Sequence, residues 1–219
     1  MEKTPFHAKP ERPAPTSATG VAGAIAADWR GGLPVLTSEK FTLRELRPDD
    51  APSMLAYLGT AEVARFISPP PTTVQGFERF ITWTHREREA GACACYGVVP
   101  AGCDHVVGLF QVRALETGFV TAEWGFVLGS DYWGTGLFLG CARRVLEFAF
   151  ETIGALRLEA RAAVMNGRGN GALRKVGAVQ EGVLRRSFKR GGQFLDQVLW
   201  SILAEDWHLQ RRGRPPVVH

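Results

Sequence analysis

Residues 130–150 read SDYWGTGLFLGCARRVLEFAF, with Gly134 and Gly136 directly ahead of a long apolar run. The apolar residues at 138, 141, 142, 145, 146 and 149 recur on one side of a helix. The first N–H groups of a helix lack partners and carry partial positive charge, and glycine has no Cβ to keep an anion from the main chain. The stretch therefore predicts a helix entered through a phosphate-binding turn. A plain strand-to-helix turn is the alternative.

Two familiar nucleotide-binding loops do not match this turn. A Walker A loop needs Lys and Ser or Thr after its glycines, and GTGLFL at 134–139 has neither in place. A dinucleotide-binding fingerprint would have glycine where Leu139 stands, and it would follow the first strand of a parallel sheet. The function of the turn therefore depends on the segments that surround it.

Upstream, the pattern predicts a strand, two helices and an antiparallel meander. The strand covers 41–47, and a helix follows over 48–58. After the loop SPPPTT, a second helix runs to Gly91, with Thr72 and Gln75 as its capping box. Three strands then follow, separated by glycine-containing turns, at 95–100, 105–115 and 119–128.

Downstream, a further strand, a short helix and a hairpin complete the pattern. The strand is LRLEARAAV at 156–164, and the helix lies within 166–177. The chain closes with a β-hairpin formed by 183–190 and 193–203 around Gly191 and Gly192. Trp124 and Trp200 lie on strands and are expected in the core.

Composition limits the class of protein. The 219 residues are 45% apolar and carry a net charge of +4, enough to favour an anionic ligand but too little for a dedicated nucleic-acid binder. The four cysteines form no CxxC pair and have no histidine at ligand spacing, so we expect no disulfide framework and no metal site. No apolar run reaches the roughly 20 residues of a membrane span. The expected location is the cytoplasm.

The ends of the chain differ from its centre. Residues 1–20 are rich in proline and charge, and we expect a flexible tail over residues 1–40. VAGAIAADW at 21–29 lies where a signal-peptide core might be sought, but it lacks Leu and Phe and follows several prolines. The expected domain covers residues 41–207, and residues 208–219 form a second tail.

Four motifs in this order resemble the GNAT N-acetyltransferases, and more narrowly the branch that contains the RimJ and RimL ribosomal-protein enzymes. They are TLRELRPDDA, AEWGFVLGSDYWGTG, NGRGNGALRKVGA followed by QEGVLRR, and LDQVLWSILAEDW. The resemblance implies an α/β (α+β) fold whose mixed, mainly antiparallel sheet splays at its centre and is flanked by helices. It also implies acetyl-CoA as acyl donor, with no metal.

The resemblance assigns cofactor-binding residues by position. It places the pyrophosphate on the main chain of Trp133, Gly134, Thr135, Gly136, Leu137 and Phe138, and the pantetheine arm beside Phe126, Val127 and Leu128. Asn166 would lie near the thioester. Among the basic residues of the following helix, Arg168 and Lys175 are the candidates for the adenosine phosphate. Phe138 departs from the family, which usually has Gly or Ala there.

Catalysis would use Glu123 as the base that deprotonates the amine, with Asn166 as an orienting residue. Glu123 could instead be a structural carboxylate paired with an arginine such as Arg113. The acid that protonates the CoA thiolate stays open. The family's Tyr is missing, Gly169 stands where this branch often has Ser, and Ser187, Ser201 or solvent would have to substitute.

The predicted function is acetyl-CoA-dependent N-acetylation of a primary amine, either a protein N-terminus or a small molecule. The alternative is a catalytically weak CoA-binding or protein-interaction module on the same fold. RNA binding through the basic residues 185–190 is a third possibility and would be strongly salt-dependent. We expect no membrane partner, and the sequence leaves a homodimer open.

Overall fold

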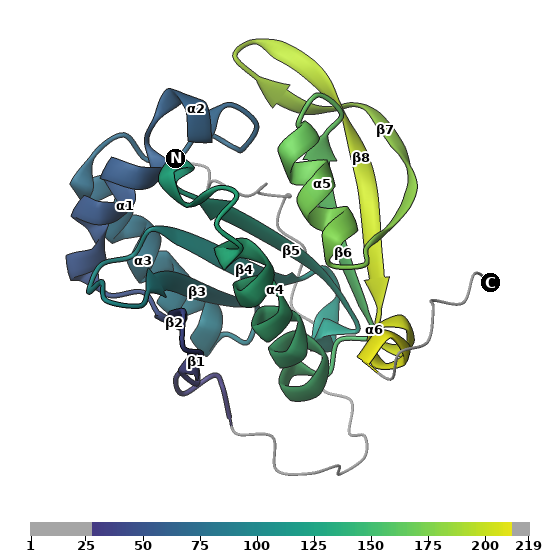
Figure 1. The fold of residues 1–219 in the computed structure, drawn as a ribbon, viewed down its shortest axis with the longest axis horizontal. Helices are drawn as coiled ribbons and strands as arrows, with labels where there is room; N and C mark the ends of the chain where they lie inside the picture. The colour runs from purple at the N-terminus through teal and green to yellow at the C-terminus, as the bar shows by residue number, and fades with distance from the viewer. Residues whose placement is uncertain (1–27, 212–219) are drawn as a thin grey trace.

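The computed structural model describes residues 28–211, which form one mixed sheet with helices on both faces (Figure 1). The strand order is β1-β2-β3-β4-β5-β6-β8-β7, and every neighbouring pair is antiparallel except β5 and β6. The expected α/β class is confirmed. The strands are β1 (Leu36–Thr37), β2 (Phe41–Glu45), β3 (Cys93–Pro100), β4 (Gly108–Ala114), β5 (Thr121–Leu128), β6 (Arg157–Ala163), β7 (Val179–Arg190) and β8 (Gln193–Leu203).

Helices pack on both faces of the sheet. They are α1 (Ala51–Leu58), α2 (Ala61–Ala64), α3 (Val74–Glu89), α4 (Leu137–Glu147), α5 (Gly167–Lys175) and α6 (Ala204–Arg211). α4 packs on one face through Cys141 and Leu146, while α1 and α3 pack on the other through Met54 and Phe77. Successive residues of β5 point to opposite faces, so Trp124 belongs to the α4 core and Val127 to the α1–α3 core.

The sheet splays at β5 and β6, as expected. The two strands pair in parallel only between residues 121–123 and residues 157–159. Beyond Glu123, β5 keeps its antiparallel partner β4 and has no partner on its other side among the described residues. The main-chain groups of this part of β5 that point away from β4 therefore face an open edge, which another extended chain can fill, except at the Leu128 carbonyl, which accepts from the indole N–H of Trp133 at 2.9 Å.

Several elements differ from the sequence-based expectation. β1 and α2 are too short to leave a periodic pattern, and α6 buries only Asp206 and Trp207. The expected Thr72–Gln75 capping box is wrong. Thr73 caps α3 instead, because its hydroxyl accepts a hydrogen bond from the N–H of Gly76 at 3.0 Å. A Cβ at Gly76 would lie 2.8 Å from Pro71, so glycine permits this tight entry into the helix.

The folded part of the chain extends beyond the expected domain of residues 41–207 at both ends. Trp29 and Leu33 are buried in the α4 core, and β1 pairs with β2. Trp29 meets Phe119 edge-on, with the ring centroids 5.5 Å apart. At the other end α6 continues to Arg211. The sequence hid the first boundary because these apolar residues are isolated among Pro, Gly and polar residues. The remaining tail predictions concern residues 1–27 and 212–219, outside the described part of the chain.

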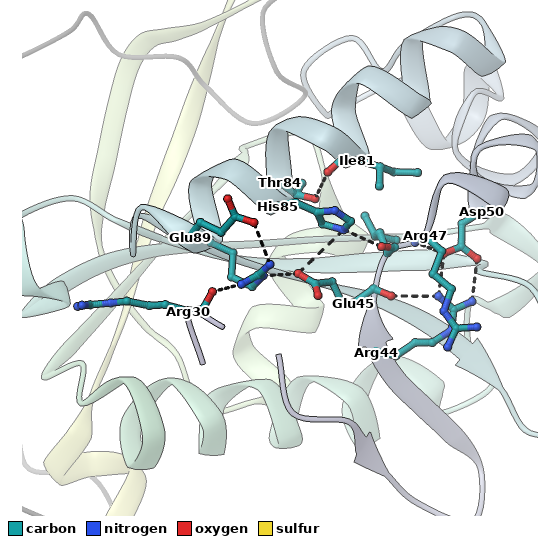
Figure 2. A network of polar contacts seen from close by, with 11 residues as sticks. Arg30, Arg44, Glu45, Arg47, Asp50, Ile81, Thr84, His85 and Glu89 are labelled. Atoms are coloured by element: carbon teal, nitrogen blue, oxygen red, sulfur yellow. Dashed lines mark hydrogen bonds and ion pairs between the residues drawn. The ribbon is translucent and has the colours of Figure 1, made fainter. Parts of the chain in front are cut away.

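A polar network fastens this N-terminal segment to β2 and α3 (Figure 2). Arg88 of α3 donates to the carboxylate of Glu45 at 2.5 Å and to the main-chain carbonyl of Arg30. Arg44 donates two hydrogen bonds of 2.7 Å to the buried carboxylate of Asp50. The hydrogen bond to Asp50 raises the pKa of Arg44 above its ordinary value, so this ion pair persists at any pH at which Asp50 is ionised.

Candidate active site

Two cavities open at the splay between β5 and β6, and they meet. The larger, here called the groove, has a volume of about 440 Å³ and runs from the β5 edge past the start of α4 to α5. The smaller, the side pocket, has a volume of about 100 Å³ and contains Glu123. Ile67, Phe126, Asn166 and Gly169 line both cavities. The two cavities therefore adjoin at these four residues.

The glycine turn forms one wall of the groove. Gly134 and Gly136 have φ angles of +76° and +85°, in the left-handed region that favours glycine, and a Cβ at either would meet open space. Among the described residues, no acceptor binds the main-chain N–H groups of residues 134–136. Thr135 supports the turn from within, because its hydroxyl donates to the carbonyl of Tyr132 and accepts from the N–H of Leu137. The turn thus presents free donors at the start of α4.

Phe138, which departs from the family pattern, does not cover the turn. No atom of its side chain lies within 4 Å of a Cβ built on Gly134 or Gly136. Its ring packs against Phe126 and Phe110, with centroid distances of 4.5 and 5.8 Å. Phe138 and Phe126 both line the groove, so the aromatic side chain narrows it beside the open strand edge and leaves the turn accessible.

Ten of the twelve residues predicted to bind the cofactor line the groove, and Thr135 and Leu137 do not. Those lining it are Phe126, Val127, Leu128, Trp133, Gly134, Gly136, Phe138, Asn166, Arg168 and Lys175. Thr135 and Leu137 do not line it: Leu137 is buried in the α4 core. The guanidinium of Arg168 lies 4.1 Å from the centre of the Trp133 ring, a cation–π contact that links α5 to the turn.

Asn166 caps α5 through a hydrogen bond with Gly169, the residue that stands where the RimJ/RimL branch often has serine. Its side-chain oxygen accepts a hydrogen bond from the N–H of Gly169 at 2.9 Å. A Cβ at Gly169 would lie 2.5 Å from the Asn166 amide nitrogen, so any larger residue there would require the Asn166 side chain to shift. Asn170, one turn further on, is buried and accepts from the indole N–H of Trp200 at 2.9 Å. Its role is to hold α5 against β8.

Glu123 lines the side pocket, with both carboxylate oxygens bound by arginine. Arg113 of β4 donates to one oxygen at 2.6 Å, and Arg161 of β6 donates to the other at 3.0 Å. The pairing with Arg113 was the structural alternative raised from the sequence. The contact with Arg161 was not expected, because β5 and β6 are far apart in sequence. The two arginines thus hold the Glu123 side chain in a well-defined position.

The contacts of Glu123 continue across the sheet as a charge ladder of three arginines and three glutamates. These are Arg113, Glu123, Arg161, Glu159, Arg157 and Glu181. Glu181 closes the ladder on β7: hydrogen bonds from Arg157 lower its pKa to about 2, and Ser201 donates to it at 2.6 Å. The ladder is balanced in charge, and its Glu181 end lies outside both cavities.

The two serines considered as proton donors do not reach the groove. Ser201 donates to Glu181, and Ser187 donates to the carbonyl of Leu184 and to the side chain of Gln197. Neither lines the groove. Tyr132 does line it, and burial together with a hydrogen bond to Tyr57 raises its pKa to about 12. It is therefore a neutral phenol at physiological pH.

Sequence reasoning missed the outer walls of the side pocket. One wall is the loop Phe66–Ser68 after α2, and the opposite wall comes from the β7–β8 hairpin through Phe188 and Gln197. The hairpin tip reaches toward α2 (Figure 1), and Arg190 donates to the carbonyl of Ala64 at 2.8 Å. No local pattern marks these residues. The positions of Gln111 and Arg113 could have been predicted from the sequence, because these residues alternate along β4 and lie on the same face of the sheet as Glu123.

The described residues provide no other kind of reactive centre. They contain no cluster of three or more His, Cys, Asp or Glu side chains that could hold a metal ion. All four cysteines are free thiols, with Cys93, Cys95 and Cys141 buried. Burial raises the pKa of all three, so these thiols stay neutral and unreactive. None of the described helices is long and apolar enough to span a membrane.

A turn with unpaired N–H groups, an open strand edge and an adjoining pocket that contains a carboxylate lie together at the splay of the sheet. Residues 40–179 match the family described as the acetyltransferase (GNAT) domain. The chain belongs to this family and is an N-acetyltransferase.

Similar proteins agree with this assignment. "Uncharacterized N-acetyltransferase p20" of Bacillus licheniformis is 23% identical over 80% of this chain and 99% of its own length. Ribosomal-protein-S5-alanine acetyltransferase from Vibrio fischeri has a similar fold, with a TM-score of 0.71 at 19% identity over 80% of this chain and 98% of that one. Mycobacterium smegmatis RimJ in complex with CoA-disulfide gives 0.69 at 21% identity over 80% and 90%. The predicted resemblance to the RimJ/RimL-like branch is confirmed.

Proposed function

We propose that this chain transfers the acetyl group of acetyl-CoA to a primary amine, either a protein N-terminus or a small molecule. The observation that carries the proposal is the junction of the groove and the side pocket at Ile67, Phe126, Asn166 and Gly169. A thioester held in the groove and an amine held in the side pocket would meet at this junction. Holding two reactants in contact is the main source of catalysis for such a transfer.

The chemistry of the groove lining supports CoA as the ligand of the groove. The free N–H groups of residues 134–136, within the turn at 133–138, suit a diphosphate, and the edge of β5 at 126–128 suits the amides of a pantetheine arm. Asn166 would lie beside the reacting end, with Arg168 and Lys175 along the wall nearest the nucleotide. Bound acetyl-CoA would supply the acetyl group as a thioester, and the transfer forms a C–N bond as the C–S bond breaks.

The protein must also remove a proton from the acceptor, because an amine is largely an ammonium ion at neutral pH. In our proposal, Glu123 accepts this proton directly or through one water. Each of its oxygens accepts one hydrogen bond from arginine and keeps a second lone pair that can accept this proton. We include a protein amine among the proposed acceptors, because the Vibrio fischeri protein of similar fold is called a ribosomal-protein-S5-alanine acetyltransferase.

One observation favours a second candidate, a CoA-binding module with little catalysis. Arg113 and Arg161 occupy both oxygens of the proposed base, as in a purely structural ion pair. Such a module would bind CoA through the same groove and release no thiol.

A steady-state assay separates the two candidates. Thiol release from acetyl-CoA is measured with a panel of amines for the wild type and for Glu123→Gln. We expect amine-dependent release that falls by about 10²-fold or more in the variant, the usual size of a general-base contribution, with CoA affinity unchanged. CoA binding without thiol release on any amine would favour the module. Full activity in the variant would exclude Glu123 as the base.

A further inference from the structure

The charges that face the side pocket do not balance. Arg113 and Arg161 line it together with a single carboxylate, that of Glu123, while the acids that balance Arg161 and Arg157 lie further along the ladder. The remaining walls include Phe66, Ile67 and Phe188, which carry no charge. The pocket therefore has a local excess of one positive charge, which favours a ligand with a negative group.

The two arginines differ in how firmly they are held. Arg161 donates to both Glu123 and Glu159, and thus lies within the ladder. Arg113 lies at the ladder's end, and its guanidinium makes one hydrogen bond to the described residues, to Glu123. It lies directly opposite Glu123 in the β4–β5 register, with its side chain on the same face. Arg113 can therefore exchange its partner at the smallest cost to the rest of the ladder.

We propose that the acceptor carries a carboxylate close to its amine, and that Arg113 selects it. This inference deepens the proposed function and rests on it. The acceptor carboxylate takes the place of Glu123 on Arg113, and the ammonium group takes the place of Arg113 on Glu123. One ion pair is thereby exchanged for two. The exchange places the acceptor's ammonium group against the Glu123 carboxylate, the proposed base.

For a polycationic acceptor, the charges of the side pocket are unfavourable. Its ammonium group can displace Arg113 from Glu123 only by leaving a guanidinium unpaired in the pocket, beside a ligand of like charge. An unpaired charge and like-charge contacts both oppose binding, which gives discrimination through repulsion as well as attraction. Diamines and longer polyamines should therefore be poor acceptors.

Three acceptors of equal chain length test the proposal: 4-aminobutanoate, 4-aminobutanamide and 1,4-diaminobutane, whose far ends carry a negative, a neutral and a positive group. We expect kcat/KM to fall in that order, with the acid at least roughly tenfold above the amide, as for a charge-assisted hydrogen bond in place of a neutral one. The peptide amides Ala-Asp-Ala and Ala-Asn-Ala repeat the comparison on a peptide amine. They distinguish an acidic peptide from a small amino acid as the source of the carboxylate.

Two variants assign the selectivity to its residue. Arg113→Gln should bring the acid-to-amide ratio of kcat/KM close to one, whatever its effect on absolute rates. Arg157→Gln, in the same ladder but outside the side pocket, should leave the ratio unchanged. An amide or diamine that matches the acid, or a ratio that survives Arg113→Gln, would overturn the proposal.

The outcome also separates this inference from the proposed function. If no acceptor gives turnover, calorimetry on the CoA-loaded protein still compares binding of the acid and the amide. Tighter binding of the acid, lost in Arg113→Gln, would support the inference even though catalysis had failed. Equal binding would contradict it.

Discussion

At the scale of single residues, Gly134 and Gly136 combine two properties that no other residue type supplies. Their positive φ angles turn the chain so that consecutive N–H groups point outward, and the missing Cβ leaves the space in front of those groups open. Phe138, the residue that most clearly departs from the family, packs sideways onto Phe126 instead of covering the turn. The departure therefore changes the width of the groove beside the strand edge and leaves the glycine turn, the proposed anion site, uncovered.

A glycine pair with matched geometry tests this role. Gly134→Ala should cost about 1 kcal/mol of stability through the strained φ angle, and its methyl group should weaken CoA binding by roughly tenfold, about the size of one lost charge-assisted hydrogen bond. Gly102→Ala is the control: Gly102 has a φ of +79° and equally open surroundings, and it does not line the groove. Thermal unfolding should shift alike in both variants, and calorimetry should show weaker CoA binding only for Gly134→Ala. Equal affinities would argue against the turn as the phosphate site.

At the scale of elements, the parts predictable from sequence are those with local causes. The helix after Gly136 has apolar residues on one side, and the strands around Glu123 alternate, so both were predicted. The side pocket was not, because Ile67, Arg161 and Gln197 lie on a loop and two strands that are distant in sequence and meet only through the splay. Thr73 caps α3 where the sequence predicted Thr72. The sequence could not distinguish the two, because neighbouring threonines have the same side chain.

The charge ladder that joins β6 to β7 predicts an acid-dependent stability. The pKa of Glu181 in the folded chain is lowered to about 2 from an ordinary value of 4.5, mainly by hydrogen bonds from Arg157. A lowered carboxylate pKa contributes stability that is present above pH 4.5 and is lost as the pH falls toward 2. Urea unfolding between pH 2.5 and 6 should show the wild type exceeding Glu181→Gln at pH 6 and the difference shrinking with acid. The effect should be modest and reduced by salt, because the side chain is partly exposed. A difference independent of pH would contradict the assignment.

At the scale of the whole molecule, the folded domain begins before the point that the sequence indicates. Segment 28–40 contributes β1 to the sheet edge, and Arg88 of α3 donates to the Arg30 carbonyl. Its two buried apolar residues, Trp29 and Leu33, pack on the α4 side of the sheet. Periodicity could not reveal this segment, because two isolated side chains in a chain of mixed polarity produce no repeat. The domain boundary therefore depends on tertiary contacts alone.

Trp29 provides the sharpest test of that boundary. Its ring packs edge-on against Phe119 and Phe148, with centroid distances of 5.5 and 6.4 Å, and little of it is exposed. Trp29→Ala should lower the free energy of unfolding by about 3–5 kcal/mol, the usual cost of emptying an aromatic site in a core. Val35→Ala, in the same segment but 61% exposed, should change it by less than about 0.5 kcal/mol. Chemical denaturation of both variants decides the matter: if Trp29→Ala is as stable as Val35→Ala, residues 28–40 are an appendage and the domain begins at β2.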